Sequence, residues 1–169
     1  MDQWQDIRQL WDKALQPIPE RLLPPTASPD SKEFLAQVGL PTEHPVDLLF
    51  YFDDRLLKRV TRGTRDYFAF GEDGGVVLLA TEAGRSEVYD VQSDGPYMFI
   101  NSSIADFVYC YGVLAQRDEQ IIELPYAQRG PLLGEVRDLI NARDPQALDP
   151  DGWLSWWDAL LEPYAEEVG

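Results

Sequence analysis

Six short apolar runs in the middle of the chain constrain its fold more than any other feature of the sequence. Each run is rich in β-branched and aromatic residues, and turn signals separate several of them, which is typical of neighbouring strands. The runs cover residues 48–52, 56–61, 66–70, 76–80, 87–91 and 97–100. Because short connections join antiparallel neighbours, the sequence predicts an antiparallel meander.

Two of these segments carry further information. Residues 76–80 are apolar on both faces, which predicts a central strand that is covered on each side. The glycine-rich segment 71–75 places Glu72 and Asp73 where a phosphate-binding loop would hold its ligand. We therefore interpret this segment as a hairpin turn.

Apolar residues at helical spacing precede this block. The pattern predicts a helix over residues 3–15, whose apolar stripe is Trp4, Ile7, Leu10, Trp11 and Leu15. Five prolines between residues 17 and 29 predict an extended connector, because proline lacks the donor N–H and restricts its neighbour. A second short helix is expected next, capped by Ser28 or Asp30.

Three helices are expected after the strands. Ser103 opens a sequence of capping-box form, which predicts a helix from this residue onward. Two further helices are predicted at roughly 128–142 and 151–165, and Asp149 or Asp151 is expected to cap the last one.

This order of elements predicts an α+β fold with a central, mainly antiparallel sheet of about six strands, flanked by N- and C-terminal helices. A length of 169 residues fits a single domain. Within it we expect N-terminal helices with a proline-rich connector (1–38), a sheet-bearing core (39–116) and a C-terminal helical segment (117–169).

A search for catalytic and metal-binding patterns returns mostly negatives. The chain has one cysteine, Cys110, and one histidine, His44. A thiolate zinc site needs several cysteines, and no nucleophile motif lies near His44. We interpret Cys110 as a small buried hydrophobe and His44 as a surface residue. Paired carboxylates leave open a small carboxylate-dependent hydrolase. Our expectation is no catalytic residue, no cofactor and no metal.

Charge is the most distinctive bulk property. Thirty acidic against 14 basic residues give a net charge of −16. Such a field repels nucleic acid and anionic membranes and attracts basic partners, although acidity also serves solubility alone. The N-terminus lacks the basic start and apolar run of a secretory signal, and no apolar stretch approaches the ~20 residues of a membrane helix. We expect a cytoplasmic protein that binds neither nucleic acid nor membrane.

Two local features are compatible with binding, and each has a structural alternative. Residues 55–65 hold five basic side chains, which we interpret as guarding an edge strand against aggregation. Trp153, Trp156 and Trp157 lie at helical spacing near the C-terminus, where we favour docking on the sheet over an exposed interface. Adjacent helix positions point about 100° apart, which leaves room for Trp156 or Trp157 at the rim.

Three segments share an order of motifs with a known family. Gly-Leu-Pro at 39–41 precedes the first strands, and Tyr-Phe-Ala-Phe-Gly-Glu-Asp at 67–73 leads into Val-Val-Leu-Leu at 76–79, Gly84 and Val-Tyr-Asp at 88–90. The most specific segment is 99–107, where an apolar strand end, Asn-Ser-Ser and a Phe-bearing helix follow one another. In this order they resemble the SUKH superfamily, and within it the fourth subgroup.

The resemblance covers residues 39–116 and implies an α+β fold with a central, mainly antiparallel sheet. Bacterial members of the family are typically immunity proteins, encoded beside polymorphic toxins that are often nucleases or nucleic-acid deaminases. The resemblance thus implies binding to a cognate toxin and supplies no catalytic residues. The alternative is a non-catalytic protein-binding or scaffold module of the same fold.

The resemblance and the charge lead to the same partner. Toxins that act on nucleic acid need basic clefts, which an acidic inhibitor can occupy. We expect five acidic residues in predicted exposed turns to contribute to the binding surface: Asp53, Asp54, Glu72, Asp73 and Asp94.

Overall fold

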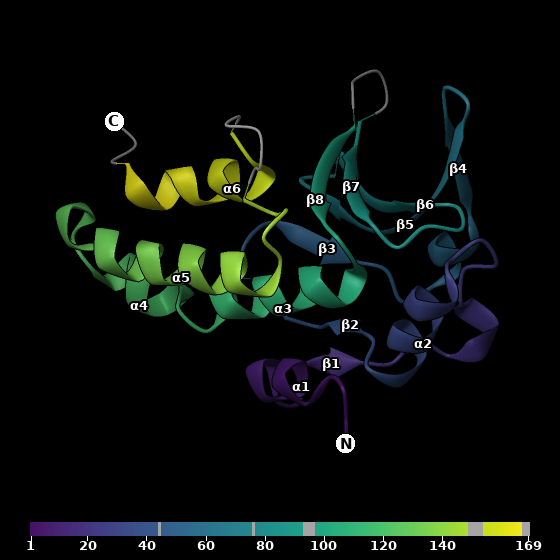
Figure 1. Ribbon diagram of the computed structural model, residues 1–169, viewed down its shortest axis with the longest axis horizontal. Coiled ribbons are helices and arrows are strands. Elements are labelled where there is room, and N and C mark those ends of the chain that lie inside the picture. The colour runs from purple at the N-terminus through teal and green to yellow at the C-terminus, as the bar shows by residue number, and fades with distance from the viewer. Residues whose placement is uncertain (44, 76, 93–96, 149–153, 167–169) are drawn as a thin grey trace.

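The middle of the chain forms a six-stranded antiparallel sheet at the upper right of Figure 1, with strand order β3-β5-β6-β7-β8 and with β4 paired to β5. The computed structural model describes residues 1–43, 45–75, 77–92, 97–148 and 154–166. The strands are β3 Leu48–Phe50, β4 Arg59–Arg62, β5 Arg65–Asp73, β6 Val77–Glu82, β7 Val88–Val91 and β8 Met98–Asn101. The α+β class and the antiparallel sheet are therefore confirmed.

The longest strand, β5, organises the sheet. Along one edge it pairs first with β4, where Arg59 lies opposite Phe68, and then with β3, where Phe50 lies opposite Gly71. Its other edge pairs with β6, which lies between β5 and β7 and confirms the predicted central strand. A bulge separates Ala69 from Gly71, and a Cβ at Gly71 would lie 2.6 Å from the Leu49 carbonyl oxygen. Glycine is thus required for β3 to approach.

Two strand predictions were wrong in detail. The expected strand at 56–61 begins as a 3-10 helix, η2 Asp54–Leu57, because the Asp53 side chain accepts a hydrogen bond from the Arg55 backbone N–H and caps that turn. Glu72 and Asp73 belong to β5 and not to a turn, since β3 and β6 pair with them on either side.

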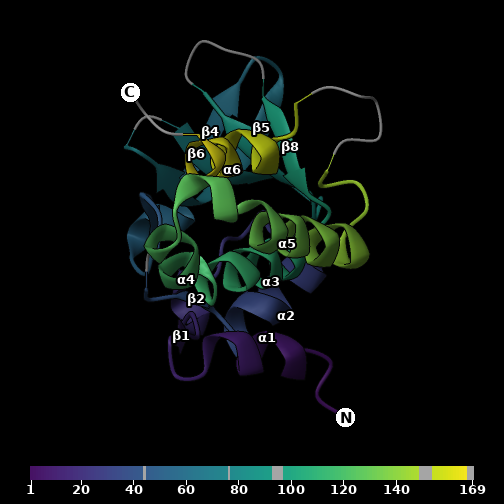
Figure 2. The same ribbon diagram turned by 90° about the vertical axis from the view of Figure 1, so that its left-hand side faces the viewer.

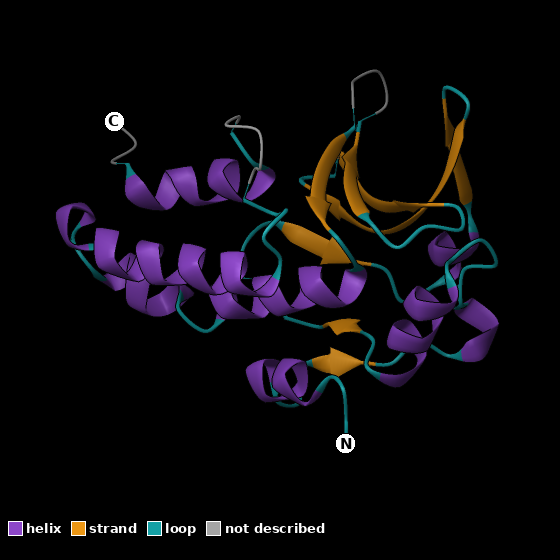
Figure 3. Cartoon of the chain, viewed as in Figure 1, coloured by secondary structure: helices purple, strands orange, loops and turns teal. Residues whose placement is uncertain are grey.

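The helices lie together on one side of the curved sheet (Figure 3). They are α1 Gln5–Trp11, α2 Pro29–Gln37, α3 Ile104–Ala115, α4 Asp118–Glu123, α5 Gly130–Arg143 and α6 Trp156–Ala165. The first helix is shorter than predicted, because Asp12 adopts a positive φ of 49° and Leu15–Gln16 pairs as β1 with β2 Leu40–Pro41. The short α4 and this two-stranded sheet were not predicted.

Side-chain caps fix several helix starts. Ser103 caps α3, as the sequence predicted, and Ser28 caps α2, which decides between the two predicted caps Ser28 and Asp30. The last helix is capped by Ser155, which forms a reciprocal capping box with Asp158. The predicted caps Asp149 and Asp151 lie outside the described residues, and the prediction was wrong because α6 starts later than 151.

An aromatic core joins α3 and α6 to the sheet. Phe107 of α3 packs against Phe50 and Phe70 of the sheet, with ring centroids 6.1 and 5.7 Å apart, and against both tryptophans of α6. Trp156 is 5% and Trp157 0% exposed, so both belong to the core and neither lies at the rim. Trp153 lies outside the described residues.

A buried polar hub, formed by Asn101, Ser102, Asp144 and Trp157, holds the end of β8 to the helices. The Asn101 side chain accepts a hydrogen bond from Trp157 Nε1 at 3.1 Å and donates one to Asp144 Oδ2 at 3.0 Å. Ser102 donates to Asp144 through its backbone N–H and its hydroxyl, at 2.7 and 2.8 Å. The Asn-Ser-Ser motif thus connects β8 with α6 and with the residue that ends α5, and its last serine caps α3.

A glycine allows α1 to approach α3 closely. Trp11 Nε1 donates a hydrogen bond to the Val108 carbonyl at 2.9 Å, and both residues are buried. A Cβ at Gly112 would lie 2.7 Å from Trp11 Nε1 and 3.2 Å from Leu10 Cβ. The indole therefore occupies the space that a side chain at Gly112 would need.

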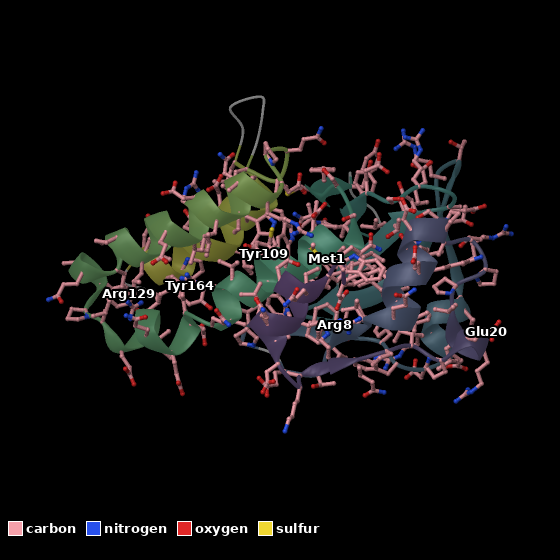
Figure 4. The ribbon with its side chains drawn as sticks, turned by 60° about the horizontal axis from the view of Figure 1, so that its bottom comes forward. Met1, Arg8, Glu20, Tyr109, Arg129 and Tyr164 are labelled. Carbon is pink, nitrogen blue, oxygen red and sulfur yellow. The ribbon has the colours of Figure 1, made fainter. Side chains whose placement is uncertain are left out.

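Arg129 joins the far ends of two helices. Figure 2 looks onto this end of the molecule, with α4, α5 and α6 towards the viewer. The buried guanidinium donates to the carbonyls of Ile122, Leu124 and Tyr164, at 3.0, 2.9 and 3.2 Å. Figure 4 shows Arg129 and Tyr164 near one another at the helical end. One cation thus satisfies carbonyls at the C-terminal ends of α4 and α6, where the helix dipole is negative.

Candidate partner-binding surface

The acidic residues expected to bind a partner come from two elements at the β3 edge of the sheet. Asp53 and Asp54 are exposed at the start of η2. Glu72 and Asp73 are half-buried at the end of β5, opposite Leu49 and Leu48 of β3. Asp94 lies outside the described residues. The register of β3 with β5 places Glu72 and Asp73 opposite the start of β3, whereas Asp53 and Asp54 follow the end of β3. Both pairs therefore lie along one edge of the sheet, which sequence spacing alone does not show.

A chain of side-chain contacts links Asp53 to Glu72. Arg55 forms a two-pronged ion pair with Asp53, with Nε–Oδ1 and Nη2–Oδ2 distances of 2.8 Å. The Arg55 guanidinium carbon lies 4.2 Å from the centre of the Tyr51 ring, and the Tyr51 hydroxyl donates to Glu72 Oε2 at 2.6 Å. No sequence pattern indicates a role for Tyr51 at this surface, because its contact with Glu72 depends on the pairing of β3 with β5.

The ionisation of these groups follows from their contacts. Hydrogen bonds from the Arg55 side chain and backbone hold the pKa of Asp53 below its usual range. Burial, with the hydrogen bond to Glu72, raises the pKa of the Tyr51 hydroxyl. Both Asp53 and Tyr51 therefore keep their ordinary charge states near neutral pH.

Carboxylates also gather behind this edge without a cation. Burial and the nearby charge of Asp47 raise the pKa of Asp73. Burial raises the pKa of Asp90 to about 6, against the lowering effect of the hydrogen bond from Trp156 Nε1 at 3.1 Å. The second oxygen of Asp90 is buried and has no hydrogen-bond partner among the described residues. Burial and the repulsion between neighbouring carboxylates thus disfavour the charged forms of Asp73 and Asp90, which take up a proton more readily than free carboxylates do.

An open hollow of about 540 Å³ lies between the start of β3 and the turn that follows β5. Asp47 and Glu72 line it, together with apolar side chains that include Leu49, which is 41% exposed. The sequence analysis missed Asp47, which has no pattern of its own.

The basic segment at 55–65 lies mostly in ion pairs. Arg59 lies 3.4 Å from Asp66, and Arg65 lies 4.0 Å from Glu82 and contacts the Tyr97 hydroxyl and ring. Its strand, β4, pairs with no described strand other than β5, and it alternates exposed and half-buried side chains. This placement agrees with the interpretation that the basic residues protect an edge strand from aggregation, since charges along such a strand oppose pairing with another chain.

Of the single cysteine and the single histidine, the structure describes only the cysteine. Cys110 is fully buried, as predicted, and burial raises the pKa of its thiol. His44 lies outside the described residues. Within the described ranges, no group of three or more His, Cys, Asp or Glu side chains is arranged to hold a metal ion. None of the described helices combines the length and apolar character needed to cross a membrane.

A comparison with protein-family models shows to which family the chain belongs. Residues 9–163 match the model of the SUKH-4 immunity protein family. The chain belongs to this family. The SUKH-4 match extends into both flanks of the segment 39–116 on which the sequence resemblance rested. SUKH-4 membership implies a cognate toxin as partner, and the family is generally non-catalytic. No curated protein and no solved structure matches the chain.

Proposed function

We propose that this SUKH-4 protein binds a cognate toxin in the cytoplasm and blocks a basic active-site cleft. The family match over residues 9–163 carries the proposal. A cleft that binds nucleic acid must present basic groups to phosphates, so a nuclease or nucleic-acid deaminase is the kind of toxin that an acidic inhibitor fits. The net charge of −16 supports this pairing, because opposite charges accelerate association.

We propose that the β3 edge supplies the contact, through Asp53, Asp54, Glu72, Asp73 and Asp94. Asp54 is exposed and has no ion pair among the described residues, so it is the carboxylate most available to a basic partner. The Asp53–Arg55 pair is already formed and therefore contributes less net attraction. Exposed Leu49 adds apolar area beside the charges, as interfaces commonly do.

The first experiment is co-purification of the chain from its native cells, with identification of the bound protein. We expect recovery of a basic toxin domain whose activity returns on separation. A large secreted toxin gene beside this one would favour immunity over a scaffold role. If no protein partner remains bound in low salt while neighbouring toxin genes are expressed, the immunity proposal fails.

The surface is tested by charge reversal on the recovered complex. Asp54→Lys should weaken association by about tenfold and reduce its dependence on salt, because one attractive charge becomes repulsive. Glu123→Lys on α4 is the matched control, since Glu123 is equally exposed and lies at the helical end. Equal effects of the two variants would show a general charge effect and refute the β3 edge as the contact.

A further inference from the structure

The hollow beside β3 has the composition of a slot for one positively charged side chain. Its charged lining is Asp47 and Glu72, and no basic residue lines it within the described part of the chain. Its floor includes Leu48 and the exposed Leu49. Lysine and arginine need both kinds of surface, because their stems are apolar while their ends are charged.

Two glycines line the slot beside its carboxylates. Gly74 and Gly75 form its turn with φ values of 59° and 74°. A Cβ at Gly74 would lie 4.0 Å from Asp47 Oδ2, and one at Gly75 would lie 4.0 Å from Glu72 Oε1. One carboxylate oxygen therefore borders each glycine. The backbone holds this arrangement, since the Gly74 N–H donates to the Asp47 carbonyl at 3.1 Å.

Both carboxylates have free capacity to accept a hydrogen bond. Glu72 Oε2 accepts from the Tyr51 hydroxyl, which fixes the side chain and leaves Oε1 on the side of the turn. The Asp47 carboxylate and Glu72 Oε1 have no side-chain hydrogen bond or ion pair with any other described residue. Arg55 lies over the Tyr51 ring and attracts Glu72 electrostatically, but it forms no ion pair with Glu72. Among the described residues, no cation thus forms an ion pair with either carboxylate of the slot.

We propose that this slot accepts a single arginine or lysine side chain of the partner, with the stem on Leu49 and the charged end between Asp47 and Glu72. Repulsion between Asp47 and half-buried Asp73 favours the same occupant, because an inserted cation relieves it. The biological identity of the occupant rests on the proposed function, but binding of the side chain itself does not require a toxin.

The test uses N-acetyl-arginine amide as the probe and its uncharged citrulline analogue, which has nearly the same shape, as the ligand control. Binding is followed by NMR at the backbone amides of Leu49, Gly74 and Gly75, at constant ionic strength. We expect saturable shifts with the arginine probe, at a dissociation constant on the order of 10 mM, and no comparable shifts with citrulline.

A matched pair of variants separates the slot from the overall field. Asp47→Asn with Glu72→Gln keeps the side-chain shapes and an oxygen for Tyr51, and it should weaken arginine binding roughly tenfold or more. Glu119→Gln with Glu123→Gln makes the same change in net charge on exposed α4 and should leave binding unchanged.

Absent shifts with arginine, equal shifts with citrulline, or unchanged binding in the slot variant would each overturn the inference. The outcome is independent of toxin capture. If the protein captures a toxin but does not bind arginine, only the slot proposal is refuted. If it binds arginine but captures no toxin, only the proposed function is refuted.

Discussion

The same substitution should have opposite effects in two helices of this protein. In α3, Gly112→Ala gains about 1 kcal/mol of helix propensity. The new Cβ would meet Trp11 Nε1 at 2.7 Å, so the indole has to move. Displacement leaves a buried N–H without its acceptor, which costs about 1–3 kcal/mol, and overpacking adds about 1–3 kcal/mol. The net expectation is a loss of about 1–5 kcal/mol in the free energy of unfolding.

Gly134→Ala in α5 is the matched control. A Cβ at Gly134 has nothing within 4 Å, so only the propensity gain remains, and the variant should be more stable by about 0.5–1 kcal/mol. Urea unfolding followed by tryptophan fluorescence measures both, since Trp11 itself reports on the α1–α3 contact. A Gly112→Ala protein as stable as the wild type, with an unshifted emission maximum, would refute the reasoning that the indole fills this space.

Three further outcomes follow from buried polar groups. Asn101→Ala should lower the free energy of unfolding by about 3–5 kcal/mol in urea titration, because it leaves a buried carboxylate and an indole N–H short of partners; a loss below about 1 kcal/mol would contradict this. The raised pKa of Asp90 means that its contribution to stability is full below about pH 4 and is lost as pH rises through about 6, so Asp90→Asn should melt higher than the wild type at pH 8 and not at pH 3.5. Arg129→Ala should loosen the ends of α4 and α6, because their carbonyls lose this donor. Backbone amide exchange should then become faster in α4 and α6 relative to the wild type but not in α2, and an equal increase in all three helices would contradict a local role for Arg129.

Local signals predicted the elements that depend on local chemistry. The serine caps of α2 and α3 depend on residues within one turn of each other, and so does the burial of Trp4, Ile7 and Trp11 in the N-terminal stripe. The end of α1 was missed because it depends on pairing between Leu15 and Pro41, which are far apart in the chain. The short α4 was missed because a helix of six residues shows too little periodicity to detect.

At the candidate surface too, local sequence signals predicted some features, while features that depend on strand pairing were missed. Glycines at 71–75 suggested a turn that includes Glu72, but the bulge at Gly71 and pairing with β3 extend the strand to Asp73. The acidic residues at 53, 54, 72 and 73 are visible in the sequence, and their part in binding stays a prediction. It did not indicate that Tyr51 would hold Glu72 in place, because that contact exists only in one register of two strands.

The buried polar hub also limits how relatives of this chain can diverge. Asp144 accepts from Asn101 and from Ser102, and Asn101 in turn accepts from Trp157, so each residue satisfies a group on another element. An apolar replacement of one member would leave its partners buried and unsatisfied, whereas a joint replacement would not. Within the family these positions should therefore be inherited or lost together, while the charged β3 edge remains free to follow a changing partner.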